Sequence, residues 1–482
     1  MIIRRNTRAM AAVFCAFVST GVARAAAATY PPDEVERGRY LAIAADCAAC
    51  HTRPQGGAAF AGGYAIGSPL GAIYSSNITP SLTAGIGSYT EPQFAAALRQ
   101  GIRADGSHLY PAMPYTAYAG LTDGDVEALF AFFRQGVAAV DVKPPETQLP
   151  VPFNVRASMI PWNALFLKDA RFKPDPARDG PWNRGAYLVT VLGHCTTCHT
   201  PRGVLMDEDT GRAFAGGPVG PWHAPNITSD KVSGIGGWNH HEIVQYLKTG
   251  AVAGKGEAAG GMAEAVTNSL QYLSPQDLDA IADYLQTVPP LHEAKDTQPA
   301  FSYGKPAVFE AALRGVAVDQ GPEGKALAAA ALFSGHCASC HQPSGSGTGD
   351  QAFPALFHNT ATGASQADNL VAAILYGVDR DAGGRHVFMP GFGSLSYVQP
   401  LTDDQIVSIG NFVLKTFGNP DAEVTAADVA NARKGGQRSS LIVLAEVGLP
   451  VAVLIVIVLL GALIWRIFRR RRGAKVPVTA RS

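Results

Sequence analysis

The chain has 482 residues, with 39 lysine plus arginine and 39 aspartate plus glutamate side chains, so its formal net charge is zero. This balance gives no support for an acidic substrate or for nucleic acid, and we expect no nucleic-acid partner. A chain of this length predicts about three domains of ~100–200 residues each. Its 52 glycines and 33 prolines indicate loop-rich domains joined by stiff connections.

Residues 1–25 have the pattern of an export signal. Three arginines precede an apolar run over residues 9–22, and an A-x-A cleavage pattern ends at Ala25. We expect cleavage after Ala25 and a mature protein outside the cytoplasm.

The sequence Cys-x-x-Cys-His occurs three times, at residues 47–51, 195–199 and 337–341. Two thiols at this spacing lie on one helical turn and can form thioether bonds to the two vinyl groups of a haem, and the next histidine can ligate the iron. A dithiol redox pair and half a zinc site are the alternatives, but neither explains the histidine in all three copies. The sequence therefore predicts three covalently bound haem c groups, held by Cys47, Cys50, His51, Cys195, Cys198, His199, Cys337, Cys340 and His341.

The first two haem segments form an internal repeat. Arg-Gly-Arg-Tyr-Leu at residues 37–41 recurs as Arg-Gly-Ala-Tyr-Leu at residues 184–188, shortly before each motif. After the motif, Phe-Ala-Gly-Gly and Asn-Ile-Thr recur in the same order and at nearly the same spacing. Duplication is the simplest explanation.

Each haem segment also ends with the pattern of a capped amphipathic helix. Thr122, Ser274 and Thr402 are the predicted caps, and apolar residues follow each at three- and four-residue spacing. Small c-type cytochromes pack such a helix against the helix that enters the haem motif. We expect a mainly α fold with three tandem class I cytochrome c-like domains, at residues 30–142, 178–290 and 323–419.

The C-terminal region contains an apolar run from Leu441 to Trp465 that includes Glu446. Its length exceeds the ~20 residues that span a bilayer, although a buried helix is the alternative. A basic tail over residues 466–482 follows. The pattern predicts one transmembrane helix over residues 441–465, the tail in the cytoplasm, and the haem domains on the periplasmic side of the inner membrane.

The sixth iron ligand decides between an enzyme and an electron carrier. A haem bound by histidine alone has an open iron position, whereas a methionine closes it and gives a high-potential carrier. Met113 and Met262 follow their motif histidines at nearly equal spacing, and Met389 follows at a shorter one. We favour these three methionines as ligands; core positions for them, and His108 or His386 as ligands instead, are the alternatives.

Four stretches of the first segment carry a resemblance to a known family: Ser-Asn-Ile-Thr-Pro at residues 76–80, Gly-Ile-Gly at 85–87, Gly-Ile-Arg-Ala-Asp-Gly at 101–106 and Leu-Tyr-Pro-Ala-Met-Pro-Tyr at 109–115. They resemble the three-haem cytochrome c subunits of bacterial membrane-bound alcohol and aldehyde dehydrogenases and gluconate-type sugar dehydrogenases. The resemblance extends over residues 35–420. It implies a non-catalytic subunit that takes electrons from a separate quinoprotein, flavin or molybdenum dehydrogenase subunit and passes them to ubiquinone or a later acceptor. It also implies the motif histidines and Met113, Met262 and Met389 as iron ligands.

Two other functions remain as alternatives at this point. One is a haem enzyme of the peroxidase or nitrite reductase type, which requires an iron with an exchangeable position. The other is a cytochrome c subunit that delivers electrons to a terminal oxidase. The chain has no Gly-x-Gly-x-x-Gly fingerprint and no phosphate loop, so the sequence gives no support to a nucleotide-dependent enzyme.

Overall fold

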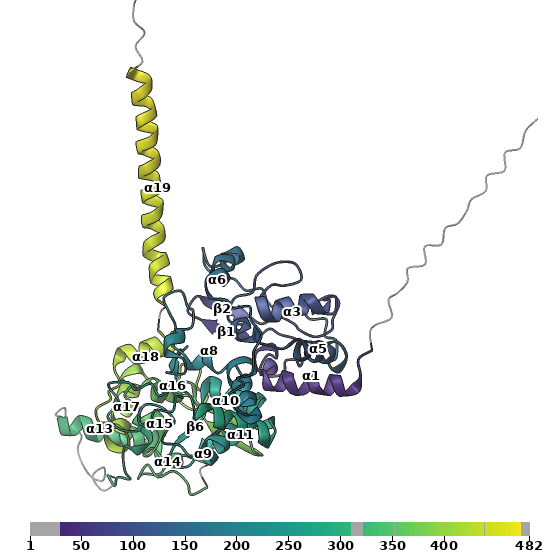
Figure 1. The fold of residues 1–482 in the computed structure, drawn as a ribbon. Coiled ribbons are helices and arrows are strands. Elements are labelled where there is room, and N and C mark those ends of the chain that lie inside the picture. The colour runs from purple at the N-terminus through teal and green to yellow at the C-terminus, as the bar shows by residue number, and fades with distance from the viewer. Residues whose placement is uncertain (1–28, 310–321, 351, 438, 474–482) are drawn as a thin grey trace, which may run out of the picture.

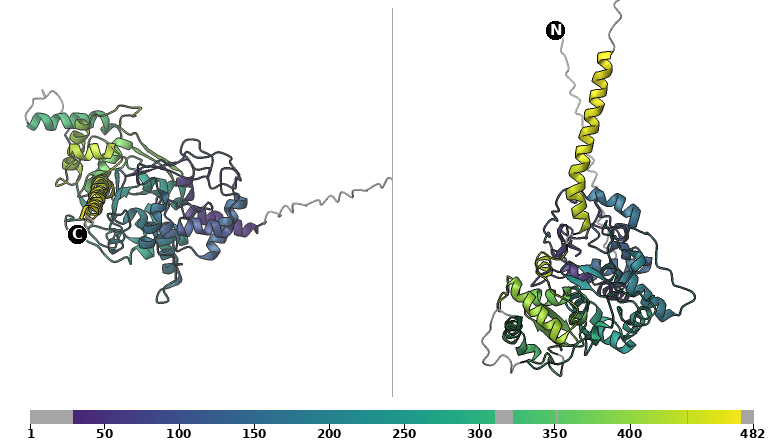
Figure 2. Two further views of the ribbon diagram at one scale, coloured as in Figure 1. Left: turned by 90° about the horizontal axis from the view of Figure 1, so that it is seen from above. Right: turned by 90° about the vertical axis from the view of Figure 1, so that its left-hand side faces the viewer.

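The computed structural model describes residues 29–309, 322–350, 352–437 and 439–473. The export signal predicted at residues 1–25 lies outside these ranges. The described chain is mainly helical, as the sequence predicts, and its strands pair in two-stranded antiparallel hairpins (Figure 1). The second haem segment lies between the first and the third (Figures 1 and 2).

The first haem segment is built on the helices α1 and α5, which pack against each other. α1 begins with Pro32, whose missing N–H would have no partner at that position anyway. α5 begins after Thr122, whose side chain accepts a hydrogen bond from the Asp125 N–H, as the sequence predicts. The elements are α1 (Pro32–Ala44), α2 (Cys47–His51), β1 (Ala65–Ser68), β2 (Gly71–Tyr74), α3 (Glu91–Gln100), α4 (Tyr115–Tyr118), α5 (Asp123–Ala131) and the π-helix η1 (Phe132–Gly136).

The second haem segment repeats this plan with α7 and α11. Asp179 caps α7, and Ser274 caps α11 by accepting from the Asp277 N–H. η2 (Arg156–Ser158) and α6 (Met159–Phe166) precede the segment. Its elements are α7 (Gly180–Tyr187), the π-helix η3 (Leu188–Leu192), α8 (Thr196–His199), η4 (Thr210–Arg212), β3 (Gly217–Val219), β4 (Trp222–Ala224), α9 (His240–Thr249), β5 (Ala251–Val252), β6 (Gly256–Glu257), α10 (Gly260–Asn268), η5 (Leu270–Tyr272) and α11 (Pro275–Leu285).

The third haem segment packs α13 against α17. Thr402 and Gln405 form the predicted capping box at the start of α17, in which each side chain bonds to the other residue's backbone N–H. η6 (Ala300–Ser302) lies in the connection before it. Its elements are α13 (Pro322–His336), α14 (Ala338–His341), α15 (Thr360–Gly363), α16 (Asp368–Tyr376), β7 (Val378–Ala382), β8 (Arg385–Met389), α17 (Asp403–Phe417) and α18 (Ala426–Arg433).

The first two segments share one hydrophobic core, whereas the third has its own. Phe130 and Leu129 of α5 and Leu188 and Ile281 of the second segment belong to the same buried cluster. Phe333, Phe412 and Phe417 meet edge to face or tilted in the third segment. In each segment, the helix before the haem motif is its entering helix (α1, α7 or α13), and the helix it packs against is its closing helix (α5, α11 or α17). Burial of these side chains holds the two helices together.

Two tyrosines also link the first two segments reciprocally. The Tyr40 hydroxyl of α1 donates to Asp277 of α11 at 2.6 Å, and the Tyr187 hydroxyl of α7 donates to Asp125 of α5. Each carboxylate also pairs with an arginine of its own segment: Asp125 with Arg37, and Asp277 with Arg184. The two segments are therefore fixed to each other by a pair of matching polar contacts.

The C-terminal prediction requires a correction. The structure has a helix in this region, α19 (Ser440–Gly473), which projects from the body of the molecule (Figures 1 and 2). Glu446 and Pro450 lie in its first turns, and Arg466 and Arg469 lie towards its end, so charge and a proline bound its apolar stretch. Across the ranges that the structure describes, no helix combines the length and the apolar character needed to cross a membrane. The prediction of a transmembrane helix over residues 441–465 is therefore wrong, and with it the predicted inner-membrane anchor with a cytoplasmic tail.

Candidate haem sites

The Cys-x-x-Cys-His motifs form short helices: all five residues of the first motif form α2, and the last four residues of the second and third motifs form α8 and α14. Asp46 (φ 51°) and His194 (φ 39°) immediately precede the first cysteine of the first two motifs and adopt the left-handed conformation. This conformation ends the helical stretch that precedes each motif and changes the direction of the chain before the first cysteine. In the third segment α13 instead continues to His336, directly before Cys337.

All three motif histidines are oriented in the same way. Nδ1 lies 2.7 Å from the Ser76 carbonyl oxygen in His51, 2.7 Å from the Pro225 carbonyl in His199, and 2.9 Å from the Pro354 carbonyl in His341. A carbonyl can accept but not donate, so Nδ1 carries the proton and Nε2 keeps its lone pair. Burial lowers the pKa of each of these imidazoles, which favours the neutral, metal-binding form. This is the arrangement that an axial haem ligand requires.

The repeated Asn-Ile-Thr sequences hold two of these carbonyls in place. The Asn77 side chain accepts hydrogen bonds from the N–H and hydroxyl of Thr79 and donates to the carbonyls of Val140 and Val142. Asn226 accepts in the same way from Thr228 and donates to the Leu291 carbonyl. These asparagines directly follow the carbonyl acceptors at 76 and 225. The sequence analysis identified the repeat but not its role in holding the carbonyls that orient the histidines. The repetition of Asn-Ile-Thr after two motifs was the one signal of that role.

The repeated glycines complete the same loop. The N–H groups of Gly62 and Gly216 donate to the carbonyls of His51 and His199 at 2.7 and 2.8 Å. Both glycines have positive φ, 71° and 84°, and a Cβ on Gly62 would lie 2.4 Å from the Ser76 carbonyl carbon. Glycine is thus required where this loop passes the residues that orient the histidine.

Four of the motif thiols lack the low pKa of a reactive redox cysteine. Burial is the main cause that raises the pKa of Cys47, Cys50, Cys195 and Cys337 to about 12. Thiol exchange proceeds through the thiolate, which these side chains disfavour at neutral pH. None of the six cysteines of the described chain is paired in a disulfide. Within the described residues, no three or more His, Cys, Asp or Glu side chains are grouped to hold a metal ion.

The first and second motifs lie close together. Besides burial, the charges of Asp46, Glu264 and Cys198 contribute to the raised pKa of Cys50, so groups of both segments act on this one thiol. α10 of the second segment packs against α2, and Glu264 of α10 accepts a hydrogen bond from Tyr64 at 3.2 Å. Haems attached to these two motifs would therefore be neighbours.

Each predicted methionine ligand borders the same core as the motif of its segment. Met113 and Met262 pack, half-buried, against the cluster that Cys47 and Cys195 also border. Met389, at the end of β8, and Cys337 border the core of the third segment. The methionines and the cysteines therefore border common apolar cores.

The histidines outside the motifs differ in their surroundings, and only His386 and His108 among them are alternative ligands. His386 is more than half exposed, lies 2.9 Å from Asp381 through Nδ1 and stacks on Phe388. His240 begins α9 and lies 3.1 Å from Asp283. His194 is buried against the Tyr118 ring, and burial lowers its pKa to about 4. His108 has a buried Nδ1 without a hydrogen-bond partner.

The residues fit covalently bound haem. Two thiols on one helical turn, a neutral histidine fixed through Nδ1 and an apolar surround recur in three segments with the same helical frame, which defines a multihaem c-type cytochrome. A sequence profile of the cytochrome c family matches residues 35–136, 183–289 and 324–417. The chain belongs to the cytochrome c family, among the cytochrome c subunits of dehydrogenase complexes, and it carries three covalently bound haem c groups.

Three relatives illustrate this membership. The fructose dehydrogenase cytochrome subunit of Gluconobacter japonicus is 47% identical over 445 residues, which are 91% of this chain and 91% of that protein. The gluconate 2-dehydrogenase cytochrome c subunit of Pantoea cypripedii is 36% identical and covers 83% of this chain and 89% of its own length. The cytochrome c subunit of the alcohol dehydrogenase (quinone) of Gluconacetobacter polyoxogenes is 36% identical, and the match covers 90% of this chain and 91% of that protein.

Proposed function

We propose that this chain takes electrons from a separate catalytic dehydrogenase subunit and carries them through its three haems to ubiquinone. The observation that carries the proposal is the common design of the three sites, in which a histidine is fixed by a backbone carbonyl and a methionine borders the same core. An iron closed on both sides binds no substrate, so this design favours electron transfer over catalysis.

The proposed attachment and ligand residues are those of the sequence prediction. The thioether bonds form to Cys47 and Cys50, to Cys195 and Cys198, and to Cys337 and Cys340. The axial pairs are His51 with Met113, His199 with Met262, and His341 with Met389. The haem supplies one-electron exchange between ferric and ferrous iron. The protein orients the iron ligands, and its low-polarity surround raises the reduction potential.

The proposed partner oxidises an alcohol carbon. The three relatives are subunits of fructose, gluconate and alcohol dehydrogenases, and each of these substrates carries a hydroxyl group. A substrate of this class gives up two electrons, whereas a haem takes one, so a chain of haems suits the transfer to a quinone. The export signal predicted at residues 1–25 supports a location outside the cytoplasm.

The ligand set is tested by replacing Met113, Met262 and Met389 with histidine, one at a time, in the haem-loaded protein. Imidazole stabilises ferric iron better than a thioether, so each variant should lower the potential of one haem and leave the other two unchanged. A redox titration in which all three couples stay unmoved would remove that methionine from the ligand set. Serine at Cys50, Cys198 or Cys340 should weaken retention of the haem of that segment under denaturing, acidic conditions.

The electron path is tested with the complex as purified. The isolated chain should have no dehydrogenase activity, and a ubiquinone analogue should reoxidise it after reduction by the copurifying catalytic subunit. Oxidation of an alcohol by the isolated chain, or stoichiometric carbon monoxide binding at neutral pH, would favour the haem enzyme instead. Rapid electron transfer to a soluble cytochrome, without transfer to the quinone, would keep the electron-carrier role but identify a different acceptor.

A further inference from the structure

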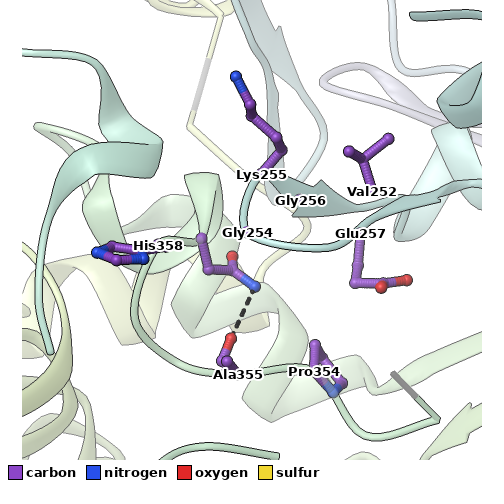
Figure 3. Close-up of a pocket in the computed structure, with 9 residues that line it drawn as sticks. Val252, Gly254, Lys255, Gly256, Glu257, Pro354, Ala355 and His358 are labelled. Carbon is purple, nitrogen blue, oxygen red and sulfur yellow. Dashed lines mark hydrogen bonds between the residues drawn. The ribbon is translucent and has the colours of Figure 1, made fainter. Parts of the chain in front are cut away.

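The β5–β6 hairpin of the second segment contacts the third segment close to the predicted iron ligands of both. The chain runs from this hairpin directly into α10, which carries Met262. On its other side the hairpin faces the loop of the third segment over residues 354–359 (Figure 3). The Thr360 N–H at the end of this loop donates to the Lys255 carbonyl at 2.8 Å. The loop begins with Pro354, whose carbonyl orients His341.

Arg380 of β7 connects the strand pair that carries Met389 to the same β5–β6 hairpin. Its side chain is 1% exposed; Nη2 donates to the Glu257 carboxylate at 2.6 Å and Nη1 to the Ala258 carbonyl at 2.7 Å. Arg380 stands on β7, and β7 pairs with β8 so that Val378 lies opposite Met389. The hairpin therefore touches the histidine side of the third site through one contact and the methionine side through the other.

A glycine lies beside the Arg380 side chain. Gly250 has a φ of 73°, and a Cβ there would lie 2.6 Å from Cδ of Arg380, so glycine leaves room for the side chain. Two donors of one planar group bind acceptors on consecutive residues, which fixes the orientation of β7 relative to the hairpin as well as their separation. A lysine would supply a single point of attachment.

We infer that Arg380 and Glu257 form a positioning pair that holds the ligand-bearing segments of the second and third haems in one fixed unit. The inference rests on the proposed function, because it takes Met262 and Met389 as iron ligands. The pair acts through the backbone of β6, α10 and β7 and touches neither haem ligand directly. Its role is to hold two distances constant during electron transfer. One is the distance from each haem iron to the sulfur atom of its methionine ligand, and the other is the distance between the two haems.

The test uses the full-length haem-loaded protein with Arg380→Met and, as the matched control, Arg433→Met. Arg433 also binds a carboxylate, Asp403 at 2.6 Å, but both residues lie within the third segment. We expect Arg380→Met to lower the potentials of the second and third haems together and to leave the first unchanged, since loosened methionine ligation favours ferric iron. The Thr360 and Ala258 amides should exchange hydrogen about tenfold faster or more. The control should change neither potentials nor these amides.

Two milder variants keep the test decisive if Arg380→Met fails to fold. Glu257→Gln retains an acceptor for Arg380 and should give a smaller shift in the same two potentials, and Arg380→Lys should behave more like Arg380→Met than like the native protein. Unchanged potentials alongside faster exchange would reduce the pair to a structural contact and overturn the inference. A shift in the third haem alone would also overturn it. Neither outcome touches the proposed function, which the methionine variants test separately.

Discussion

Gly185 of α7 lies against the backbone of Ala280 in α11, so that a Cβ on this glycine would stand 1.9 Å from the Ala280 carbonyl oxygen. The first segment has the same contact between Gly38 and Ala128, at 1.8 Å. The repeated Arg-Gly-x-Tyr-Leu sequence is thereby explained. Its arginine pairs with the closing helix, its glycine permits the helices to meet, its tyrosine reaches the other segment, and its leucine enters the core.

The glycine contact predicts a position-dependent effect within one helix. Gly185→Ala should destabilise the protein by about 1–3 kcal/mol, because the backbone carbonyl opposite cannot move away without separating α7 from α11. Gly180→Ala is the matched control, since no atom outside its own neighbourhood lies within 4 Å of the added Cβ. It should be neutral or stabilising by up to about 1 kcal/mol. Thermal unfolding of both variants checks this, and equal midpoints would refute the close contact.

Much of the fold could be predicted because its signals are local. The caps Thr122, Ser274 and Thr402 each start the expected helix, since a side-chain acceptor and apolar spacing suffice to define it. Contacts between segments left no such signal. Arg380 is an ordinary arginine in the sequence, and its burial depends on how the third segment packs on Gly250.

In the candidate sites too, residues with a local sequence signal could be predicted, and residues that act through tertiary contacts could not. The cysteines and histidines were evident from their spacing, whereas the carbonyls that orient the histidines belong to residues 76, 225 and 354, whose side chains carry no signal. The C-terminal prediction was wrong because charged residues and a proline lie within and around the apolar run, so its length alone does not define a membrane span.

The reciprocal tyrosine contacts predict matching losses in the two segments. Tyr40→Phe and Tyr187→Phe each remove a hydrogen bond to a carboxylate that also pairs with arginine, and each should cost about 1.5–3 kcal/mol. Tyr272→Phe is the control, because its side chain is 58% exposed and the change should stay within about 0.5 kcal/mol. Denaturant unfolding of the three variants measures the differences; a Tyr40→Phe midpoint equal to the control would mean that the contact adds nothing.

Asp277 should make stability depend on pH in the acid range. Burial acts to raise the pKa of this carboxyl, but hydrogen bonds from Arg184 and Tyr40 outweigh burial and hold its pKa below the usual range. The folded pKa is thus below the unfolded value of about 3.9, so the contribution is complete above that value and is lost as the pH falls through the folded pKa. Asp277→Asn should be less stable than the native protein at pH 6, as midpoints of thermal unfolding would measure.

The gap between Asp277→Asn and the native protein should narrow steadily below about pH 4. The control is Asp404→Asn, which changes a carboxylate in the first turn of α17 and should give a small difference from the native protein throughout. A gap that stays constant from pH 6 to the acid limit would show that the Asp277 carboxylate is not preferentially stabilised in the folded state.

The asparagines behind the axial histidines should tune individual haems. Asn77 is 3% exposed, and its four hydrogen bonds hold the loop that presents the Ser76 carbonyl to His51. That carbonyl increases the electron donation of the imidazole and so stabilises ferric iron. Asn77→Ala should therefore raise the potential of the first haem and, by leaving buried groups unpaired, cost about 1–3 kcal/mol of stability.

Asn226→Ala is the matched variant in the second segment and should raise the potential of the second haem instead. Asn411→Ala separates stability from tuning, because Asn411 bonds to both backbone groups of Val424 and not to the loops that present the carbonyls to the motif histidines. It should lower the unfolding midpoint and leave all three potentials unchanged. The couples are assigned in a redox titration by comparison with the methionine-to-histidine variants. If Asn77→Ala and Asn226→Ala moved the same couple, or none, the loops would not control the histidines as their hydrogen bonds indicate.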